Sequence, residues 1–226
     1  MTAHLYWDRA WRTQQGRAAW SEPDPWVVSS VGLFHARGAR DLLDLGCGVG
    51  RHALYLSEEG FAVRAVDRSA AAVSFAGAEA TARGLATRIE QADVTALPFP
   101  SDSMDVVLAF NVVYHADEDG LARALEEVRR VLRPHGLYQT TMLSKRNVEA
   151  GRGTEVAPNT FVQPGAGDDK VHPHLYVDAA DLVRLHTGFQ LLSAFDAEQT
   201  AAGSYHWHCV FEASQSPVVR DGAHPS

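Results

Sequence analysis

The 226-residue sequence has little cysteine, little lysine and no long apolar run. Its two cysteines, Cys47 and Cys209, are far apart and form no Cys-x-x-Cys pair, so neither a disulfide framework nor a zinc site follows from them. No apolar segment approaches the roughly 18 residues that a membrane span needs. The N-terminal residues also lack the apolar stretch of a signal peptide. These absences predict a soluble, cytoplasmic protein without a membrane partner.

Positive charge is also in short supply. Lysine and arginine together number 20 against 28 acidic residues, which gives a formal net charge of −8. A protein that binds duplex DNA non-specifically needs a basic surface to displace counterions, so the charge balance argues against a nucleic-acid partner. The composition, 46% hydrophobic and 21% charged, is typical of a globular domain long enough to bury a sheet between helices. Both a monomer and a homodimer are compatible with it.

The sequence does contain an alternation of short apolar runs and helical patterns, which starts at residue 41. Strands are expected at 41–45, 61–66, 87–91, 104–110, 137–143, 189–195 and 205–212. Helices are expected at 51–59, 69–83, 121–132 and 178–186. This pattern predicts an α/β fold with a Rossmann-like doubly wound sheet, mostly parallel with one antiparallel strand near the C-terminus. Ligands of such sheets bind at the carboxyl ends of the parallel strands.

Three segments differ from this alternation. Residues 1–36 are expected to form an aromatic-rich lid or appendage, because they contain Trp7, Trp11, Trp20 and Trp26. Residues 145–175 are polar and show no clear period, and a connection of that length inside a compact domain is usually functional or disordered. We therefore expect a ligand-binding domain at 37–214, with a substrate lid inserted at about 145–175, and a flexible tail at 215–226.

A glycine-rich loop follows the first expected strand and leads into a helix. It reads Asp44-Leu45-Gly46-Cys47-Gly48-Val49-Gly50, so its spacing is G-x-G-x-G. A dinucleotide fingerprint has the spacing G-x-G-x-x-G, and counting from Gly46 its third glycine would fall on Arg51. Glycines let the backbone approach a ligand closely. Asp44 can attract a ligand's ammonium group, directly or through water.

Two further acidic residues follow the next expected strands. Asp67 ends the second strand, where a carboxylate can accept hydrogen bonds from both hydroxyls of a ribose. Asp93 follows the third strand and can accept a hydrogen bond from an adenine amino group, with Arg68 and Val94 beside the ring. Asp67 could instead simply place charge at a helix N-terminus, and Asp93 could be a surface acid. Their order after the glycine loop favours the nucleoside-binding roles.

Together these features resemble the class I S-adenosylmethionine (SAM)-dependent methyltransferase family. The resemblance covers roughly residues 38–144 and also includes the segments 97–99, 105–107 and 130–136, in the family's order. It implies the fold and SAM as cofactor, with S-adenosylhomocysteine as product. Cofactor-binding roles are expected for Asp44, Gly46, Gly48, Gly50, Asp67, Arg68, Asp93, Val94 and Asn111. Residues 1–36 and 145–212 look more loosely like the small-molecule branch that includes tellurite-resistance and thiol methyltransferases.

Methyl transfer is an in-line displacement in which the cofactor supplies the electrophile, so the protein mainly aligns an N, S or O nucleophile and excludes water. Asn111 and His115 follow the fourth expected strand, beside the expected position of the methyl group. His115 can act as a base or be a plain loop histidine. His174 and His206 are the other catalytic candidates. Imidazoles can bind metals, but the histidine spacings fit no standard zinc pattern, and no metal is expected.

The sequence thus predicts a SAM-dependent methyltransferase that acts on a small-molecule acceptor. A protein methyltransferase and a SAM-binding regulator without turnover remain alternatives. A nicotinamide-dependent oxidoreductase is disfavoured by Arg51 at the third-glycine position. Most tryptophans of residues 1–36 are expected to pack in the core. Trp26 is the exception, because it follows Pro25 near the expected mouth of the SAM site and is a candidate for a cation–π contact.

Overall fold

The computed structural model describes residues 3–199 and 201–214, so the tail expected at 215–226 lies outside the described residues. The strands are β1 (Asp41–Leu45), β2 (Ala62–Asp67), β3 (Arg88–Gln91), β4 (Met104–Ala109), β5 (Leu132–Ser144), β6 (Thr154–Ala157), β7 (Thr160–Val162), β8 (His174–Val177), β9 (Phe189–Glu198) and β10 (Tyr205–Ala213). The helices are α1 (Ala3–Trp11), α2 (Gln14–Ala18), α3 (Pro25–Ala36), α4 (Arg51–Glu58), α5 (Ala70–Ala82), α6 (Glu118–Val131), α7 (Ala179–Leu185) and the 3-10 turn η1 (Asp169–Val171).

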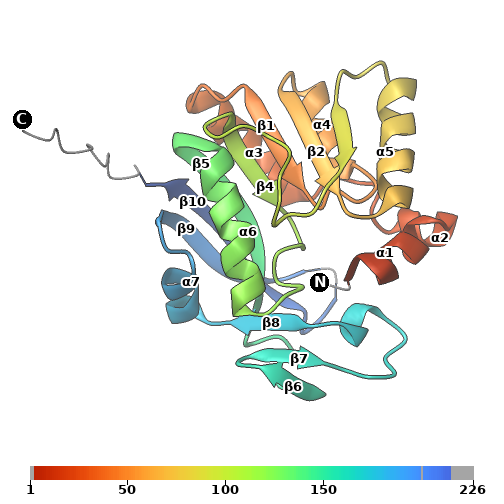
Figure 1. Cartoon of the computed structure of the whole chain (residues 1–226), viewed down its shortest axis with the longest axis vertical. Coiled ribbons are helices and arrows are strands. Elements are labelled where there is room, and N and C mark those ends of the chain that lie inside the picture. Colours follow the sequence, from red (N-terminus) through yellow and green to blue (C-terminus); the bar gives the residue numbers. More distant parts are fainter. Residues whose placement is uncertain (1–2, 200, 215–226) are drawn as a thin grey trace, which may run out of the picture.

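The described strands form one mixed sheet (Figure 1). Its main part has the order β3-β2-β1-β4-β5-β10-β9. Strands β1 to β5 are parallel, and β10 runs antiparallel between β5 and β9. The extension β8-β7-β6 continues from the end of β5, where Leu143 and Ser144 pair with β8. The mostly parallel, doubly wound sheet expected from the sequence is confirmed.

Helices cover both faces of the sheet, each over its own cluster of buried side chains. On one face, α3 and α4 contribute Val27, Phe34 and Leu56. On the other face, α6 contributes Leu121 and Leu125, which share one side of the helix as their spacing of four predicts. Burial of such side chains stabilises the fold by roughly 1.5–3 kcal/mol each. The two layers hold the sheet rigid and leave the carboxyl ends of its parallel strands for the site.

Two arginines near the end of α6 explain the motif segments that lie outside the expected cofactor site. Arg130 donates hydrogen bonds to the carbonyl oxygens of Leu97, at 3.0 Å, and Phe99, at 2.7 Å. Arg133 pairs with Asp105 and with the first residue of β1. These bonds fasten α6 and the start of β5 to the loop before β4. The segments 97–99, 105–107 and 130–136 therefore brace the sheet.

Strand β5 begins at Leu132 and not at residue 137, which corrects the boundary expected from Pro134 and Gly136. The strand tolerates this stretch because its pairing with β4 shifts register between Met104 and Val106. His135 takes a φ of 64°, which marks the irregularity. Pro134 and Gly136 mark the end of a helix in the sequence pattern. In the structure α6 ends at Val131, and β5 begins at the next residue.

The segment 145–175 contains more regular structure than its polar sequence indicates. Strands β6 and β7 form an antiparallel hairpin, and β7 pairs with β8. Strands of three or four residues are too short to show a period. The expected helix at 178–186 and the last two strands are present as α7, β9 and β10. In the part of the chain that the structure describes, every helix is too short or too polar to cross a bilayer.

The N-terminal helices lie against the edge of the domain near α5 (Figure 1). Asp8 of α1 fastens this segment, because its Oδ1 accepts hydrogen bonds from Ser69 Oγ at 2.8 Å and from the backbone N–H of Ala71 at 3.0 Å. Burial of Val27 and Phe34 shows that α3 is part of the main core, whereas α1 and α2 lie outside it. The boundary at residue 36 and the lid role of 145–175 stay predictions.

Candidate functional site

A cavity of about 900 Å³, counting the space at its mouth, lies at the carboxyl ends of the parallel strands and is walled on one side by α1. Ligands of doubly wound sheets bind at this edge, and the volume is typical of a small-molecule site. Seven of the nine residues predicted to bind cofactor line it: Gly46, Gly48, Asp67, Arg68, Asp93, Val94 and Asn111. Asp44 and Gly50 are not among its lining residues.

The glycine loop forms the floor of the cavity. Gly46 has a φ of 61°, and a Cβ there would lie 2.5 Å from Val112 Cγ2. Gly48 has a φ of 53°, and a Cβ there would lie 3.1 Å from Trp11 Cζ2. Positive φ costs a non-glycine residue about 1–2 kcal/mol even without a clash. The loop therefore needs glycine for its backbone shape and for its close contact with β4's loop and α1.

Asp67 is held in place by the backbone around the cavity. Its Oδ2 accepts a hydrogen bond from Gly48 N at 2.9 Å, and its Oδ1 accepts one from Ser69 N at 2.8 Å. Each carboxylate oxygen can accept a second bond, so Asp67 keeps acceptor capacity toward the cavity. Burial raises the pKa of this carboxyl, opposed by the backbone hydrogen bonds. The carboxylate is fixed at the end of β2, where the sequence predicts a ribose contact.

Asp93 and Arg68 form a pair at the rim of the cavity. Asp93 Oδ2 lies 3.0 Å from Arg68 Nη1, while Asp93 Oδ1 accepts hydrogen bonds from Thr95 N and Oγ1. Burial acts to raise the pKa of Asp93, but the hydrogen bonds from Thr95 and the Arg68 charge outweigh it and lower the pKa. Asp93, Arg68 and Val94 all line the cavity, and their contact with an adenine stays a prediction.

Asp44 lies beneath the glycine loop and is 2% exposed. No hydrogen bond to its Oδ2 is found among the described residues. Burial raises the pKa of this carboxyl to about 7, although the nearby Arg51 charge opposes the rise. A buried carboxylate oxygen without a partner is costly. Such an atom, next to a loop that only glycine can form, is suited to meet the ammonium group of a ligand.

Asn111 is fixed beside the floor of the cavity. Its side-chain Oδ1 accepts a hydrogen bond from Thr141 Oγ1 at 2.9 Å, and its Nδ2 donates to Gln199 Oε1 at 3.1 Å. The residue has a φ of 59°, a conformation that asparagine tolerates better than most residues. The backbone turn after β4 and the side-chain amide are therefore both set by the protein.

Helix α1 and the turn after α2 provide an aromatic wall, in a segment expected to be an aromatic-rich lid but with most of its tryptophans expected in the core. Trp7 and Trp11 stack with ring centroids 5.0 Å apart, and Trp20 lies edge-on to both. The Arg51 guanidinium lies 4.9 Å from the centroid of the Trp20 ring. All four side chains line the cavity. The spacing of four between Trp7 and Trp11, which puts both on one helix face, was the available signal.

The expectation about Trp26 was wrong. Its ring packs against Phe110, Phe195 and His208 and does not line the cavity. Pro25 starts α3, and the helix carries Trp26 toward the sheet face and away from the mouth. Trp7, Trp11 and Trp20 pack together in a small hydrophobic cluster, as expected for most of these tryptophans, and they also line the cavity.

The three catalytic candidates occupy different positions. His115 lines the cavity, and burial lowers its pKa well below the usual value. His174 lies behind it, with ring centroids 4.7 Å apart. His206 lies beside the Tyr114 ring, 5.9 Å away, and burial lowers its pKa to about 4. Of the three, His115 has access to the cavity, while His174 and His206 are not among its lining residues.

Comparison with known proteins finds relatives among methyltransferases. A family model described as a methyltransferase domain matches residues 42–136. A probable S-adenosylmethionine-dependent methyltransferase of Mycobacterium tuberculosis is 35% identical over 120 residues, which are 53% of this chain and 42% of that protein. The demethylmenaquinone methyltransferase of Thermus thermophilus is 38% identical over 114 residues, 49% of this chain and 50% of that protein. The chain thus spans about half the length of the curated relatives it matches.

Solved structures match the fold over most of the chain. The 1,6-didemethyltoxoflavin-N1-methyltransferase of Burkholderia thailandensis, with bound 1,6-didemethyltoxoflavin and S-adenosylhomocysteine, gives a TM-score of 0.70 at 20% identity and covers 95% of this chain and 89% of its own. An S-adenosylmethionine-dependent methyltransferase from Clostridium acetobutylicum gives 0.68 at 15% identity, over 88% and 96%. The family match spans the glycine loop, Asp67 and Asp93. Residues 42–136 are therefore similar to a methyltransferase domain, and the fold is that of solved SAM-dependent methyltransferases.

Proposed function

We propose that this chain transfers the methyl group of SAM to an N, S or O nucleophile of a small-molecule acceptor by in-line displacement. One observation carries the proposal. Residues that the sequence predicts to hold SAM, and aromatic side chains of α1 that it does not, line the same cavity. The cavity thus has a side suited to the cofactor and a side left for an acceptor.

The strand side of the cavity fits the methionine part of SAM. Gly46 leaves a space that a Cβ would fill, and Asp44 presents a buried carboxylate oxygen without a described partner. In the proposed complex, Asp44 attracts the ammonium group, directly or through water, and Asn111 lines the pocket close by. SAM supplies an electrophilic methyl carbon. The protein's own contribution is to hold that carbon in line with the nucleophile.

The rim of the cavity fits the nucleoside part. Asp67 keeps acceptor capacity for the two ribose hydroxyls, because its oxygens each accept one backbone hydrogen bond. Asp93 accepts a hydrogen bond from the adenine amino group, with Arg68 and Val94 beside the ring. These assignments use three acids, Asp44, Asp67 and Asp93, that lie at or just after the ends of β1, β2 and β3. They explain why the acids line up along one edge of the sheet.

The helix side of the cavity favours a small acceptor. Trp7, Trp11 and Trp20 cover it, and Asp8 ties α1 to the start of α5. Aromatic rings that cover a cavity help to exclude water from the reaction, and their flat faces suit a small acceptor better than a folded protein chain. His115 approaches from the β4 side and contacts the acceptor region. The protein methyltransferase therefore stays the weaker alternative.

The proposal is tested by calorimetric titration of SAM and of S-adenosylhomocysteine into wild-type protein, Asp67→Ala and a control, Asp119→Ala. Asp119 is exposed on α6 and does not line the cavity. We expect micromolar binding to wild type and control. Loss of two hydrogen bonds to a charged group, each contributing about 1.5–3 kcal/mol, lowers the affinity of Asp67→Ala at least a hundredfold.

The acceptor class needs a second measurement with the same proteins. Labelled SAM is incubated with metabolite pools and with protein pools, and transfer of label is followed. Transfer to metabolites supports the proposal, and transfer to protein favours the alternative. Binding without any transfer indicates a SAM-binding regulator. No binding of either ligand by folded wild-type protein contradicts the proposal.

A further inference from the structure

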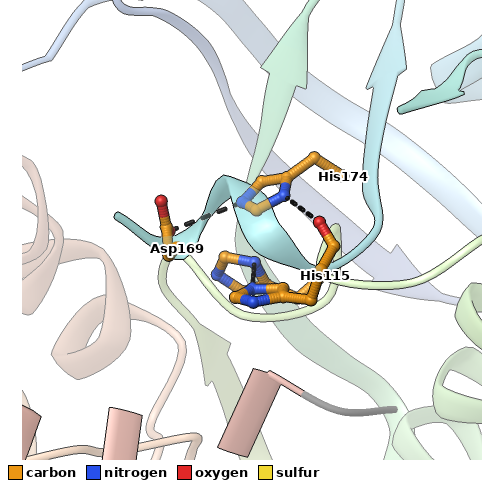
Figure 2. Close-up of side chains that lie close together, drawn as sticks. His115, Asp169 and His174 are labelled. Atoms are coloured by element: carbon orange, nitrogen blue, oxygen red, sulfur yellow. Dashed lines mark hydrogen bonds and ion pairs between the residues drawn. The ribbon is translucent and has the colours of Figure 1, made fainter. Parts of the chain in front are cut away.

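One cluster of side chains beside the cavity is not explained by SAM binding. His115 lies in the loop after β4, Asp169 in η1, His172 just after η1, and His174 at the start of β8. One ligand atom from each residue lies within 4.8 Å of those of the other three. Figure 2 shows the side chains of His115, Asp169 and His174 pointing toward one another. Segments far apart in the sequence therefore bring three imidazoles and a carboxylate to one point.

The cluster is deeply buried. The exposed fractions of His115, His172 and His174 are 6%, 2% and 1%, and that of the Asp169 side chain is 18%. Buried polar groups are normally paired, and buried charges are paired or bind metals. His172 Nδ1 and His174 Nε2 have no hydrogen-bond partner among the described residues. Two orphaned ring nitrogens in one buried cluster call for a physical explanation.

His174 and Asp169 face each other in an arrangement that needs a positive centre between them. His174 Nδ1 lies 2.8 Å from the carbonyl oxygen of His172, to which it must donate, so Nε2 of the neutral ring carries a lone pair. That Nε2 lies 3.4 Å from Asp169 Oδ2. A lone pair and a carboxylate oxygen at this distance repel each other unless a proton or a metal cation lies between them.

The surroundings favour a metal ion over a proton. The rings of His115 and His172 lie 4.7 Å and 4.8 Å from that of His174, centroid to centroid. Ligand atoms from four residues converge within 4.8 Å of one another, which is more than one shared proton would bring together, and imidazole nitrogen is a common metal ligand. Lys170 Nζ already pairs with Asp169 Oδ1 at 2.9 Å and leaves Oδ2 toward the cluster. A metal ion between His174 Nε2 and Asp169 Oδ2 gives both atoms a partner.

The cluster also has the supports that are typical of a metal site. Histidine ligands usually donate their other ring N–H to a carbonyl or carboxylate, and carboxylate ligands are themselves hydrogen-bonded. His174 donates to a carbonyl, and Asp169 is held by Lys170. Two ligand-to-ligand distances are close to those of a zinc site. His174 Nε2 lies 3.4 Å from Asp169 Oδ2, and His172 Nε2 lies 3.1 Å from His115 Nδ1. Tetrahedral ligands at about 2.0–2.1 Å from zinc are about 3.3 Å apart.

We propose that His115, Asp169, His172 and His174 bind a divalent transition-metal ion of the zinc type at the wall of the cavity. Three imidazoles and one carboxylate suit zinc, iron, nickel or copper, whereas calcium and magnesium prefer oxygen ligands. Because His115 also lines the cavity, the ion joins segment 169–174 to the loop after β4. The site does not depend on methyl transfer, and its test is separate from that of the proposed function.

No metal was expected from the sequence, because the histidine spacings fit no standard zinc pattern. The ligands follow the pattern Asp169-x-x-His172-x-His174, completed by His115 from a distant loop. The contribution of Asp169 and the approach of the β4 loop both depend on the fold. The spacing of residues along the chain predicts neither of these two contributions.

The test uses untagged protein, treated with a chelator and titrated with Co²⁺ and then Zn²⁺. We expect one Co²⁺ per chain, a visible absorption band of a low-coordinate Co²⁺ site, and displacement of that band by Zn²⁺. Asp169→Asn and His174→Gln should each weaken Zn²⁺ binding at least a hundredfold, because even outer partners of metal ligands contribute ten- to a hundredfold. His206→Gln, a buried histidine outside the cluster, should bind as wild type does.

Circular dichroism and thermal melting without metal show whether each variant is folded. Two results overturn the proposal: no saturable Co²⁺ or Zn²⁺ binding by folded wild-type protein, or equal affinities in wild type, Asp169→Asn and His174→Gln. Should His174→Gln fail to fold, Asp169→Asn still decides the question, since it keeps the size of the side chain and removes its charge. SAM binding measured on the same metal-free samples separates this test from that of the cofactor site.

Discussion

The two sides of the cavity are built in different ways. The side proposed to bind the cofactor lies at the ends of β1, β2 and β3, and its shape is set by the backbone, as in the positive φ angles of Gly46 and Gly48. The proposed acceptor side is made by side chains from distant segments that contact one another, such as Trp7 of α1 and His115 of the loop after β4. The residues of the cofactor side can be predicted from short spacings along the chain. Those of the acceptor side can be identified only once the fold is known.

The difference implies different responses to substitution. A site shaped by the backbone tolerates few substitutions, because each of its glycines has a conformation that other residues reach only with strain. A side built from side chains on α1 depends on how firmly that helix is attached. We therefore expect changes in the cofactor side to have larger effects than changes in the attachment of α1.

The largest effect is expected for Gly46→Ala. A Cβ at a φ of 61° and 2.5 Å from Val112 Cγ2 adds backbone strain and a clash. We expect the free energy of unfolding to fall by about 2–5 kcal/mol and SAM binding to become undetectable. Urea unfolding and calorimetry measure the two effects.

The matched control is Gly77→Ala. Gly77 lies inside α5 with nothing within 4 Å of its would-be Cβ. Alanine is the better helix former, so this variant should gain up to about 1 kcal/mol and bind SAM normally. If Gly46→Ala binds SAM as tightly as Gly77→Ala does, the cofactor side is not set by backbone shape.

The contrast also explains how much the sequence predicted. The order of strands and helices and seven lining residues follow from local patterns, because a strand end fixes where the next side chain lies. Trp26 was wrongly predicted at the mouth of the cavity, because its position after Pro25 does not determine which side of α3 its ring lies on. Asp169 and Arg51 went unassigned, since their partners are remote in sequence. Strands of three residues, such as β7, leave no period to detect.

The next largest effect concerns Asp44 and pH. Burial raises the pKa of Asp44 to about 7 in the free protein, and the proposed ammonium contact needs the carboxylate. Below pH 7 the free protein holds a proton that binding must remove, so SAM affinity should fall about tenfold for each pH unit. Above pH of about 8 the ligand's own α-amino group loses its proton. Calorimetry from pH 5 to 9 should therefore show strongest binding between about 7 and 8.

Asp44→Asn provides the comparison for this profile. The amide cannot titrate, so its SAM affinity should be lower at pH 7.5 and flat on the acid side. A wild-type profile that is equally flat below pH 7 means that Asp44 does not act through its charge. The role assigned to the ammonium contact would then have to be withdrawn.

The smallest effect is expected for Asp8→Ala, which loosens α1 without touching the cavity wall. The variant loses the bonds from Asp8 Oδ1 to Ser69 Oγ and Ala71 N, a cost of about 1–2 kcal/mol in stability. Because Trp7 and Trp11 move with α1, SAM affinity should fall three- to tenfold. Asp178→Ala is the matched control, because Asp178 caps α7 outside the cavity lining. Both variants should lose similar stability, and only Asp8→Ala should lose affinity; equal affinities would show that α1 covers the cavity without contributing to binding.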